Sequence, residues 1–530
     1  MAHVSTEQMM QTATSLHQAG RFADAVEIYR GILSIQPNHA EALYRLAAIA
    51  AQSAQISSAL DLMQRAVAVS PENPIYHRTL GDLWKQAGRL DSAIASYRRA
   101  VQIKPDDAET CNKLGMALDD AEELDQAIAS YQRAIELVPA YAAARNNLAS
   151  VWRTKGELDK AIAGYQQALN HDPQSAIIHN TLGRTWEMAG HADKALACYR
   201  RALEINPKYA NSLYNIGLMR LAAGDFAGGW DALELRWQTT GFESRPAFAQ
   251  PMWTGAERAD ITVLLTTEQG LGDTIHFIRY APMVAQRCRR VLLDCPAKLV
   301  QLLKGIDGIA EIIPRGTALP PFDVHCPLMS LPRIFGTTLQ AIPNRVPYVH
   351  ADPIRSVLWS ERFAGENRLK IGLVWAGNIK NKQGRHRSMP LSALAPLAGV
   401  PGVAFYSLQL GPPAMQAQTP PAGLDLVDLS ADLHDLADTA AVIANLDLVI
   451  SIDTVVAHLA GAMAKPVWTL LSLAADWRWL LDRSDSPWYP TMRLFRQTSP
   501  SDWSAVVRQV ATALESPAQL KHPETRNPET

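Results

Sequence analysis

The sequence is poor in cysteine, in net charge and in long apolar runs, and each shortage excludes a class of protein. Its 530 residues include five scattered cysteines and no Cys-x-x-Cys pair, which argues against a disulfide framework or a structural metal site and favours a reducing cytoplasm. A net charge of −2 provides no basic face, so we expect no nucleic acid partner. The sequence contains no stretch of about 18 uncharged apolar residues and no signal-peptide pattern, so we expect no membrane span.

A 34-residue period runs through the first half of the chain. It is marked by prolines at Pro37, Pro71, Pro105, Pro139, Pro173 and Pro207. Glycines such as Gly88, alanines such as Ala93 and tyrosines such as Tyr97 recur at the same spacing. Each unit reads as two helices joined by a turn at the glycine, and the proline follows the second helix, which it cannot continue. The pattern resembles the tetratricopeptide repeat (TPR), which predicts an all-α solenoid of about six to seven repeats over residues 5–237.

One position of the repeat is expected to face the concave groove that stacked repeats form. Across successive repeats this position holds Tyr44, Arg78, Asn112, Asn146, Asn180 and Tyr214. The asparagines Asn112, Asn146 and Asn180 can hydrogen-bond the backbone of an extended peptide with little regard to its sequence. A protein or peptide in the groove is therefore an expected partner. The alternative is that these asparagines are simply solvated polar positions.

Alternating strands and helices replace the repeats in the second half. A linker rich in Gly, Pro, Ser and Thr spans residues 238–259, and the polar tail at 516–530 is expected to be disordered. Short apolar runs predict strands at Ile261–Thr266, Val291–Asp294, Glu311–Pro314, Asp323–Cys326, Lys370–Trp375, Val403–Leu408, Leu426–Asp428, Leu448–Ser451 and Val467–Leu471. These strands form two series, which predicts an α/β domain of two Rossmann-like lobes, at 260–352 and 366–515.

Three segments follow predicted strands directly and carry residues suited to a ligand site. In the first, Gly272 permits a tight turn and Asp273 lies at the cleft edge, where it either acts chemically or only caps the next helix. In the second, small residues and four cations follow the first strand of the second lobe. They suit a diphosphate, for which we select Asn378, Lys382 and Arg387 as ligands. The alternative for the second segment is an ordinary charged surface loop.

The third segment places Asp453 and Thr454 at a turn and His458 one helical turn further on. Thr454 offers a hydroxyl and a backbone N–H to a phosphate. Alternatively, Asp453 and Thr454 cap the helix and His458 is structural. Beyond this segment, Arg478 stands among tryptophans that either stack on a base or sugar or pack between the lobes. Arg478 is the member of that group that we expect to contact ligand.

The order and strand-end placement of the three segments resemble the heptosyltransferase-like glycosyltransferases, a family 9-like group with the two-lobed GT-B fold. The resemblance covers most of both predicted lobes. It implies that Asp273 is the catalytic base and that Lys382 contacts a phosphate of the donor. It also implies that Asp453, Thr454 and His458 hold the diphosphate of a nucleotide sugar.

The resemblance has one departure and one architectural counterpart. Val455 stands where many members of that family carry glycine, so the identity of the donor does not follow from it. The joining of a repeat array to such a domain is similar to the O-linked N-acetylglucosamine transferases, in which the solenoid presents protein acceptors. That similarity concerns architecture and not motifs.

Together, these features predict a glycosyltransferase that moves a hexosyl or heptosyl unit from a nucleotide-diphosphate donor to an acceptor hydroxyl, with inversion. Asp273 is the expected base. The sequence has no Asp-x-Asp triplet, so we expect no metal, and no cofactor besides the nucleotide-sugar co-substrate. The alternative is a non-catalytic TPR interaction scaffold with a nucleotide-sugar-binding or degenerate GT-B module.

Overall fold

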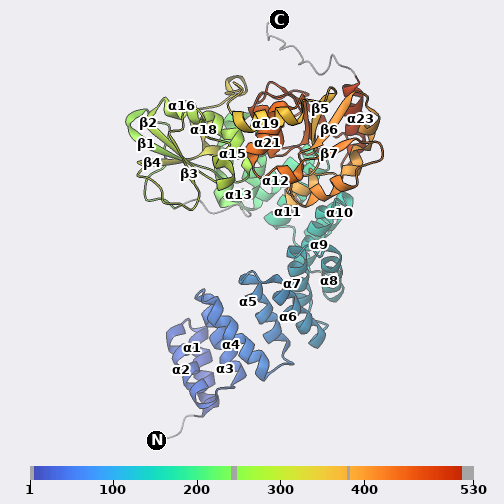
Figure 1. Ribbon diagram of the computed structural model, residues 1–530. Helices are drawn as coiled ribbons and strands as arrows, with labels where there is room; N and C mark the ends of the chain where they lie inside the picture. The colour runs from blue at the N-terminus through green and yellow to red at the C-terminus, as the bar shows by residue number, and fades with distance from the viewer. Residues whose placement is uncertain (1–4, 240–246, 379–381, 516–530) are drawn as a thin grey trace. The chain divides into compact units, whose positions relative to one another are not determined.

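The computed structural model describes residues 5–239, 247–378 and 382–515 (Figure 1). The chain divides into two compact units, Met1–Leu182 and Gly183–Thr530. The boundary falls inside the repeat array, so the last repeats fold together with the sheets that follow them.

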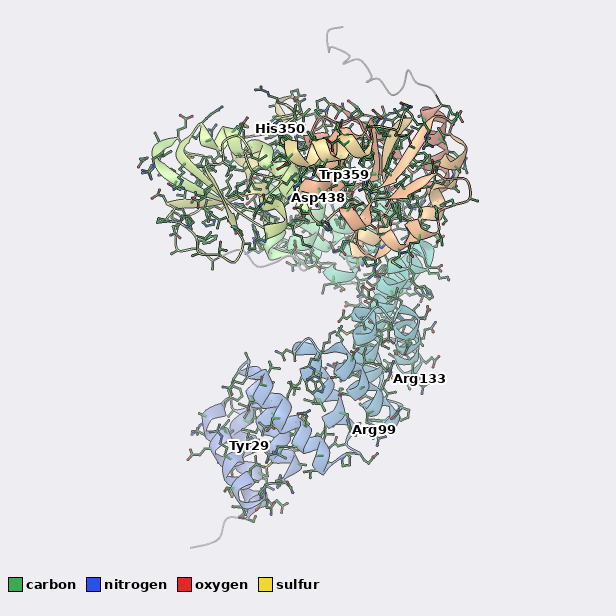
Figure 2. All side chains as sticks on the ribbon, viewed as in Figure 1. Tyr29, Arg99, Arg133, His350, Trp359 and Asp438 are labelled. Carbon is green, nitrogen blue, oxygen red and sulfur yellow. The ribbon has the colours of Figure 1, made fainter. Side chains whose placement is uncertain are left out.

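The first unit is all-helical, and the predicted solenoid of tetratricopeptide repeats is confirmed. Its helices are α1 (Thr6–Gln18), α2 (Phe22–Ile35), α3 (Ala40–Gln52), α4 (Ile56–Val69), α5 (Pro74–Gln86), α6 (Leu90–Ile103), α7 (Ala108–Asp120), α8 (Leu124–Leu137), α9 (Ala142–Thr154) and α10 (Leu158–His171), and α11 (Ala176–Met188) crosses the boundary. Most repeats pack their two helices around a recurrent aromatic such as Tyr29, which is fully buried (Figure 2), and Met63 takes this place in the second repeat. Neighbouring repeats must stack because a single pair cannot cover its own apolar face.

The turn inside each repeat requires a residue in the left-handed conformation. Gly88 has a φ of 73° and Gly156 a φ of 79°, which glycine adopts without steric cost. Where the sequence lacks this glycine, Ala54 (φ 57°) and Glu122 (φ 66°) adopt the same conformation. A residue with a Cβ pays about 1–2 kcal/mol there, so the stacking of the repeats imposes the turn even on unsuited residues.

A second recurrent glycine lets the two helices of a repeat approach closely. A Cβ added at Gly81 would lie 2.6 Å from Cε1 of Tyr97, and one added at Gly115 would lie 2.7 Å from Cε1 of Tyr131. Both distances are too short for non-bonded carbon atoms. The buried tyrosine of the second helix therefore fills the space that the glycine of the first helix leaves open.

The second unit begins with the last repeats, which share a core with the first of two sheets. These repeats contain α12 (Ala192–Ile205), α13 (Ala210–Ala222), α14 (Phe226–Leu233) and the 3₁₀ turn η1 (Glu234–Gln238). Phe226, Trp230 and Leu233 of α14 pack in one apolar cluster with strand residues such as Val263. The end of the array is thus part of the α/β fold.

Both sheets of the second unit are parallel (Figure 1). The first has the order β3-β2-β1-β4, with β1 (Arg258–Thr266), β2 (Cys288–Cys295), β3 (Glu311–Pro314) and β4 (Val324–Pro327). The second has the order β10-β9-β8-β5-β6-β7, with β5 (Leu369–Val374), β6 (Val403–Ser407), β7 (Leu426–Asp428), β8 (Leu448–Ile452), β9 (Val467–Leu471) and β10 (Met492–Arg496). Parallel strands need crossover connections, and helices lie in most of them, although the connection from β3 to β4 contains none.

These helices cover the sheets. They are α15 (Leu271–Phe277), α16 (Ala281–Ala285), α17 (Ala297–Val300), α18 (Leu331–Ile334), α19 (Pro353–Arg362), α20 (Lys382–His386), α21 (Leu436–Asn445), α22 (Val455–Ala462) and α23 (Trp503–Leu514). Helix α19 packs beside α21, where Trp359 and Asp438 lie (Figure 2). Arg355 of α19 joins this pair of helices by an ion pair of 2.7 Å to Asp438.

The observed strands confirm the predicted α/β class. Strands β3, β7 and β9 have the predicted bounds, and β1 begins at Arg258, inside the segment predicted as a linker. Strand β10 was not predicted. The predicted domain limits remain predictions, and the tail at 516–530 lies outside the described residues.

Candidate functional site

Each sheet contains a point where strand order reverses, and ligand crevices of parallel sheets open at such points. In the first sheet β1 lies between β2 and β4, and in the second β5 lies between β6 and β8. The loops after β1, β5 and β8 therefore leave the sheets beside these reversals. The loop after β1 leads to Asp273 in the first turn of α15, and the loops after β5 and β8 carry Arg387 and Asp453, respectively.

The loops after β1 and β8 meet through α15 and α22. A Cβ added at Gly272 would lie 3.0 Å from Cδ2 of His458 and 3.5 Å from Cα of Val455. A side chain at position 272 would therefore push the two helices apart. Gly272, predicted for its turn, also provides the contact between the two sheets' helices, and Val455 lies at the same contact.

Asp273 has two partners at this junction. Its Oδ2 accepts a hydrogen bond of 2.9 Å from the backbone N–H of Gly270 and so caps α15. Its Oδ1 accepts a bond of 2.5 Å from Nη2 of Arg478, which follows β9 of the other sheet. Burial raises the pKa of Asp273, and the Arg478 guanidinium opposes that rise. Asp273 therefore caps α15, which was the alternative to a chemical role, and it also bonds a residue of the second sheet.

Arg478 is a buried cation shared by two carboxylates. It lies in the 3₁₀ turn η8 (Trp477–Trp479), and its Nη1 donates to Oδ1 of Asp476 at 2.8 Å. Burial alone lowers the pKa of Arg478, but Asp476 and Asp273 raise it above its ordinary value. Its Nε has no hydrogen-bond partner among the described residues.

A second ion pair joins the loops after β5 and β8. Nη1 of Arg387 donates to Oδ2 of Asp453 at 3.2 Å, and Asp453 is almost fully buried. Thr454 is the N-cap of α22, yet its hydroxyl does not cap the helix and instead shares a 2.9 Å hydrogen bond with Ser451. The first amides of α22 therefore have no side-chain cap among the described residues, which is a suitable arrangement for an anion.

His458 belongs to a buried network that links the two sheets. The hydroxyl of Tyr489 lies 2.9 Å from Nδ1 of His458 and 3.1 Å from Nδ1 of His276, which is on α15. Burial lowers the pKa of His458 to about 3 and that of His276 well below its ordinary value. The ring of His458 also stacks on Trp479 with the centroids 5.2 Å apart. Both imidazoles are therefore neutral, and the structural alternative for His458 has a physical basis.

The loop after β5 is fixed by a glutamine that the sequence interpretation missed. Oε1 of Gln409 accepts from the backbone N–H groups of Trp375 and Ala376, at 3.1 and 2.8 Å. Asn378 is exposed at the end of this segment. The side chain of Lys382 lies outside the described residues, so its predicted contact with phosphate remains a prediction.

Two other residues of this region were not predicted. Glu268, five residues before Asp273, forms a bidentate ion pair with Arg236 of η1. The sequence did contain one signal for Glu268, since its carboxylate lies next to a strand end. Nothing in the sequence indicated that its partner would come from the end of the repeat array.

The predicted asparagine column lies on the first helices of successive repeats, α7, α9 and α11. Nδ2 of Asn147 donates to Oδ1 of Asn112 at 3.1 Å, and Thr181 donates to Oδ1 of Asn146 at 3.2 Å. Asn112 and Asn180 are buried, with 6% and 5% of their surface exposed. Part of the hydrogen-bonding capacity of the column is therefore used between neighbouring helices.

Neither a metal cluster nor a membrane-spanning helix occurs in the described part of the chain. The residues at 5–239, 247–378 and 382–515 contain no group of three or more His, Cys, Asp or Glu placed to hold a metal ion. None of the helices in these ranges is long and apolar enough to cross a membrane.

Comparisons with known proteins identify the repeats. Models of the tetratricopeptide repeat match residues 16–83 and 112–176, and a further TPR model matches 81–119 and 189–224. The amino-terminal part of the chain, to about residue 220, therefore consists of tetratricopeptide repeats.

The chain is also similar to one curated protein and to solved repeat structures. It is 28% identical over 323 residues to Protein FlbA of Caulobacter vibrioides, covering 56% of this chain and 53% of FlbA. It thus spans about half the length of that relative. MamA is 27% identical to this chain with a TM-score of 0.30, and the match covers 32% of this chain and 93% of MamA. A repeat protein from Parabacteroides merdae is 16% identical with a TM-score of 0.41, covering 45% of this chain and 94% of that one.

Proposed function

We propose that this protein is a glycosyltransferase with a GT-B domain, which moves a sugar from a nucleotide-diphosphate donor to an acceptor hydroxyl. One observation carries the proposal: the 2.5 Å ion pair of Asp273 with Arg478 joins the loops after β1 and β9. Arg387, Asp453 and the uncapped amides of α22 come from the adjoining loops of the second sheet. This combines a carboxylate with anion-binding groups at the carboxyl ends of both sheets.

The proposed reaction is a single displacement. The Asp273 carboxylate takes the proton of the acceptor hydroxyl as that oxygen attacks the anomeric carbon of the donor. The new C–O bond forms while the bond from the anomeric carbon to the diphosphate oxygen breaks. The electron pair leaves with the nucleoside diphosphate, and the configuration at the anomeric carbon inverts. Burial, which raises the pKa of Asp273, makes the carboxylate a better proton acceptor.

The departing diphosphate gains negative charge. In this proposal, cationic side chains and backbone amides stabilise that charge. Arg387 has an Nε without a partner among the described residues, and Arg478 has another. The N-terminus of α22 adds backbone N–H groups and the positive end of a helix dipole. Lys382, five residues before Arg387, is predicted to supply a further charge, but its side chain lies outside the described residues. Preorganised donors of this kind stabilise charge that develops in a transition state.

The acceptor in this proposal is a hydroxyl on a protein. Tetratricopeptide repeats commonly bind proteins or peptides, and the column of Asn112, Asn146 and Asn180 supplies amides on their first helices. Asn146 keeps more exposure than the other two. It is therefore the member of the column that we expect to contact a peptide.

The experiment uses the full chain with a panel of UDP-, GDP- and ADP-sugars. Binding is measured by calorimetry, and transfer is measured by mass spectrometry of proteins co-expressed with the wild type or with Asp273→Asn. The proposal expects one donor to bind both forms and a mass increment that disappears in the variant. If no donor binds and no increment depends on Asp273, the proposal is refuted.

A specific observation favours the alternative of a non-catalytic scaffold. Both oxygens of Asp273 already have partners, Gly270 and Arg478, which suits a purely structural carboxylate. The scaffold alternative expects a nucleotide sugar to bind while protein glycosylation stays the same in Asp273→Asn. The same two measurements therefore separate the two functions.

A further inference from the structure

The end of the repeat array contacts loops of both sheets. Nε1 of Trp230 donates to the backbone oxygen of Thr337, which lies beyond the first sheet, at 2.7 Å. The ring of Trp230 lies edge-on to Trp477 of η8, with centroids 5.3 Å apart. The backbone N–H of Leu481, also after β9, donates to Ala222 of α13 at 3.0 Å. The last repeat therefore contacts a segment beyond the first sheet and the loop that carries Arg478.

Arg236 is the innermost of these contacts. Its side chain is fully buried, and its Nε and Nη2 donate to the two carboxylate oxygens of Glu268 at 2.8 and 2.9 Å. Nη2 also donates to Ser330 after β4, and Nη1 donates to Glu234, at 3.0 and 2.9 Å. A planar fork of this kind fixes the orientation of a carboxylate as well as its position.

Glu268 stands at the start of the loop that leads to Asp273. The next residue, Gln269, has a φ of 59°, a left-handed conformation that residues with a Cβ rarely adopt. Gly270 then donates to Asp273. A strained residue persists where its neighbours on both sides are held, here by Arg236 through Glu268 and by the cap at Gly270.

We propose that Arg236 is a positioning residue for the reaction: by holding Glu268 it sets the loop at 267–270 and therefore the place of Asp273. This inference rests on the proposed function for its effect on transfer, but its effect on the loop stands separately. The repeat array thus contributes to the catalytic geometry as well as to acceptor binding.

The test compares four full-length variants with the wild type. Glu268→Gln keeps the shape of the side chain but removes the charge that Arg236 binds, and Arg236→Lys keeps the charge but loses the fork. Arg333→Gln is the matched control, because it breaks an exposed ion pair of 2.6 Å between Arg333 of α18 and Asp231 of α14. Asp273→Asn reports on the proposed function itself.

Two readouts are taken on each variant. In hydrogen exchange, the amides of Gly270 and Thr274 should exchange at least about tenfold faster in Glu268→Gln, since they depend on the loop, and Arg333→Gln should match the wild type. In single-turnover transfer, Glu268→Gln should lose about 100-fold in rate while its donor dissociation constant stays within about threefold. Arg236→Lys should fall between the wild type and Glu268→Gln in both readouts.

The outcomes separate the two proposals. If Asp273→Asn abolishes transfer but Glu268→Gln keeps wild-type rate and exchange, the positioning role is wrong and the proposed function stands. If the wild type transfers nothing, the proposed function fails, and exchange alone decides whether Arg236 orders the loop. Equal loop exchange in Glu268→Gln, Arg236→Lys and the wild type overturns the inference in either case.

Discussion

Mild acid should destabilise the second unit through the two histidines that share Tyr489. Burial lowers the pKa of His458 to about 3, and it lowers that of His276 well below its ordinary value. Below about pH 6.5 the unfolded chain therefore binds protons that the folded chain does not bind. The stability contributed by the neutral imidazoles is complete above that pH and is lost progressively toward pH 3 for His458.

The size of the effect follows from the distance between the working pH and the ordinary pKa. At pH 5.5 the loss is about 1.4 kcal/mol for each buried histidine, or about 3 kcal/mol for the pair, relative to neutral pH. Asp273 titrates in the opposite sense because burial raises its pKa, so only a comparison between variants isolates the histidines.

The assay is urea unfolding followed by tryptophan fluorescence at pH 7.5 and pH 5.5. Trp479 stacks on His458 and Trp488 lies 4.5 Å from His276 between ring centroids, so the signal reports on this region. His458→Gln should reduce the loss of stability between pH 7.5 and pH 5.5 by about 1.4 kcal/mol relative to the wild type. The control His350→Gln removes an exposed imidazole and should follow the wild type (Figure 2). Equal pH dependence in His458→Gln and the wild type would show that His458 does not contribute to the acid sensitivity.

Three other changes have defined outcomes. Glu122→Gly should stabilise the first unit by up to about 1 kcal/mol in thermal unfolding. Glycine relieves the cost of a φ of 66°, although it also loses more chain entropy on folding, and a lower melting temperature would contradict this expectation. Gly115→Ala should cost about 1–3 kcal/mol in urea unfolding, because its Cβ would lie 2.7 Å from Tyr131, and an unchanged midpoint would be inconsistent with that contact. Tyr489→Phe should cost about 2–4 kcal/mol in the second unit, because it leaves Nδ1 of both histidines without the hydroxyl, and an effect below about 1 kcal/mol would show that water replaces it.

The repeats could be predicted from sequence because one physical requirement recurs many times. Each turn needs a residue in the left-handed conformation, so glycines such as Gly88 mark the period. The turn keeps this conformation even at Glu122, where the glycine is missing. The strands of the two sheets were predicted where most of their residues are apolar, as in Val467–Leu471. Strand β10 was missed because Arg493 and Arg496 interrupt its apolar pattern.

The candidate site was only partly predictable, for a different reason. Asp273, Asp453 and His458 stand in local turn motifs, which a sequence displays directly. Their partners are distant in the chain: Arg478 is 205 residues from Asp273. Arg387 is 66 residues from Asp453, and Tyr489, the partner of His458, also bonds His276, 213 residues away. Such pairs follow from the packing of two sheets, and no local pattern indicates them.

The charges around Arg478 explain how one carboxylate can serve both as a structural partner and as a base in the proposed reaction. Without ligand, Arg478 is shared by Asp273 and Asp476 and is close enough to Asp453 for that carboxylate to raise its pKa further. A bound diphosphate would add negative charge on the same cation, and the hold of Arg478 on Asp273 would weaken in proportion. Burial would then dominate the proton affinity of Asp273, which rises. On this reasoning the donor itself prepares the base, so proton transfer from the acceptor becomes favourable only when the leaving group is in place.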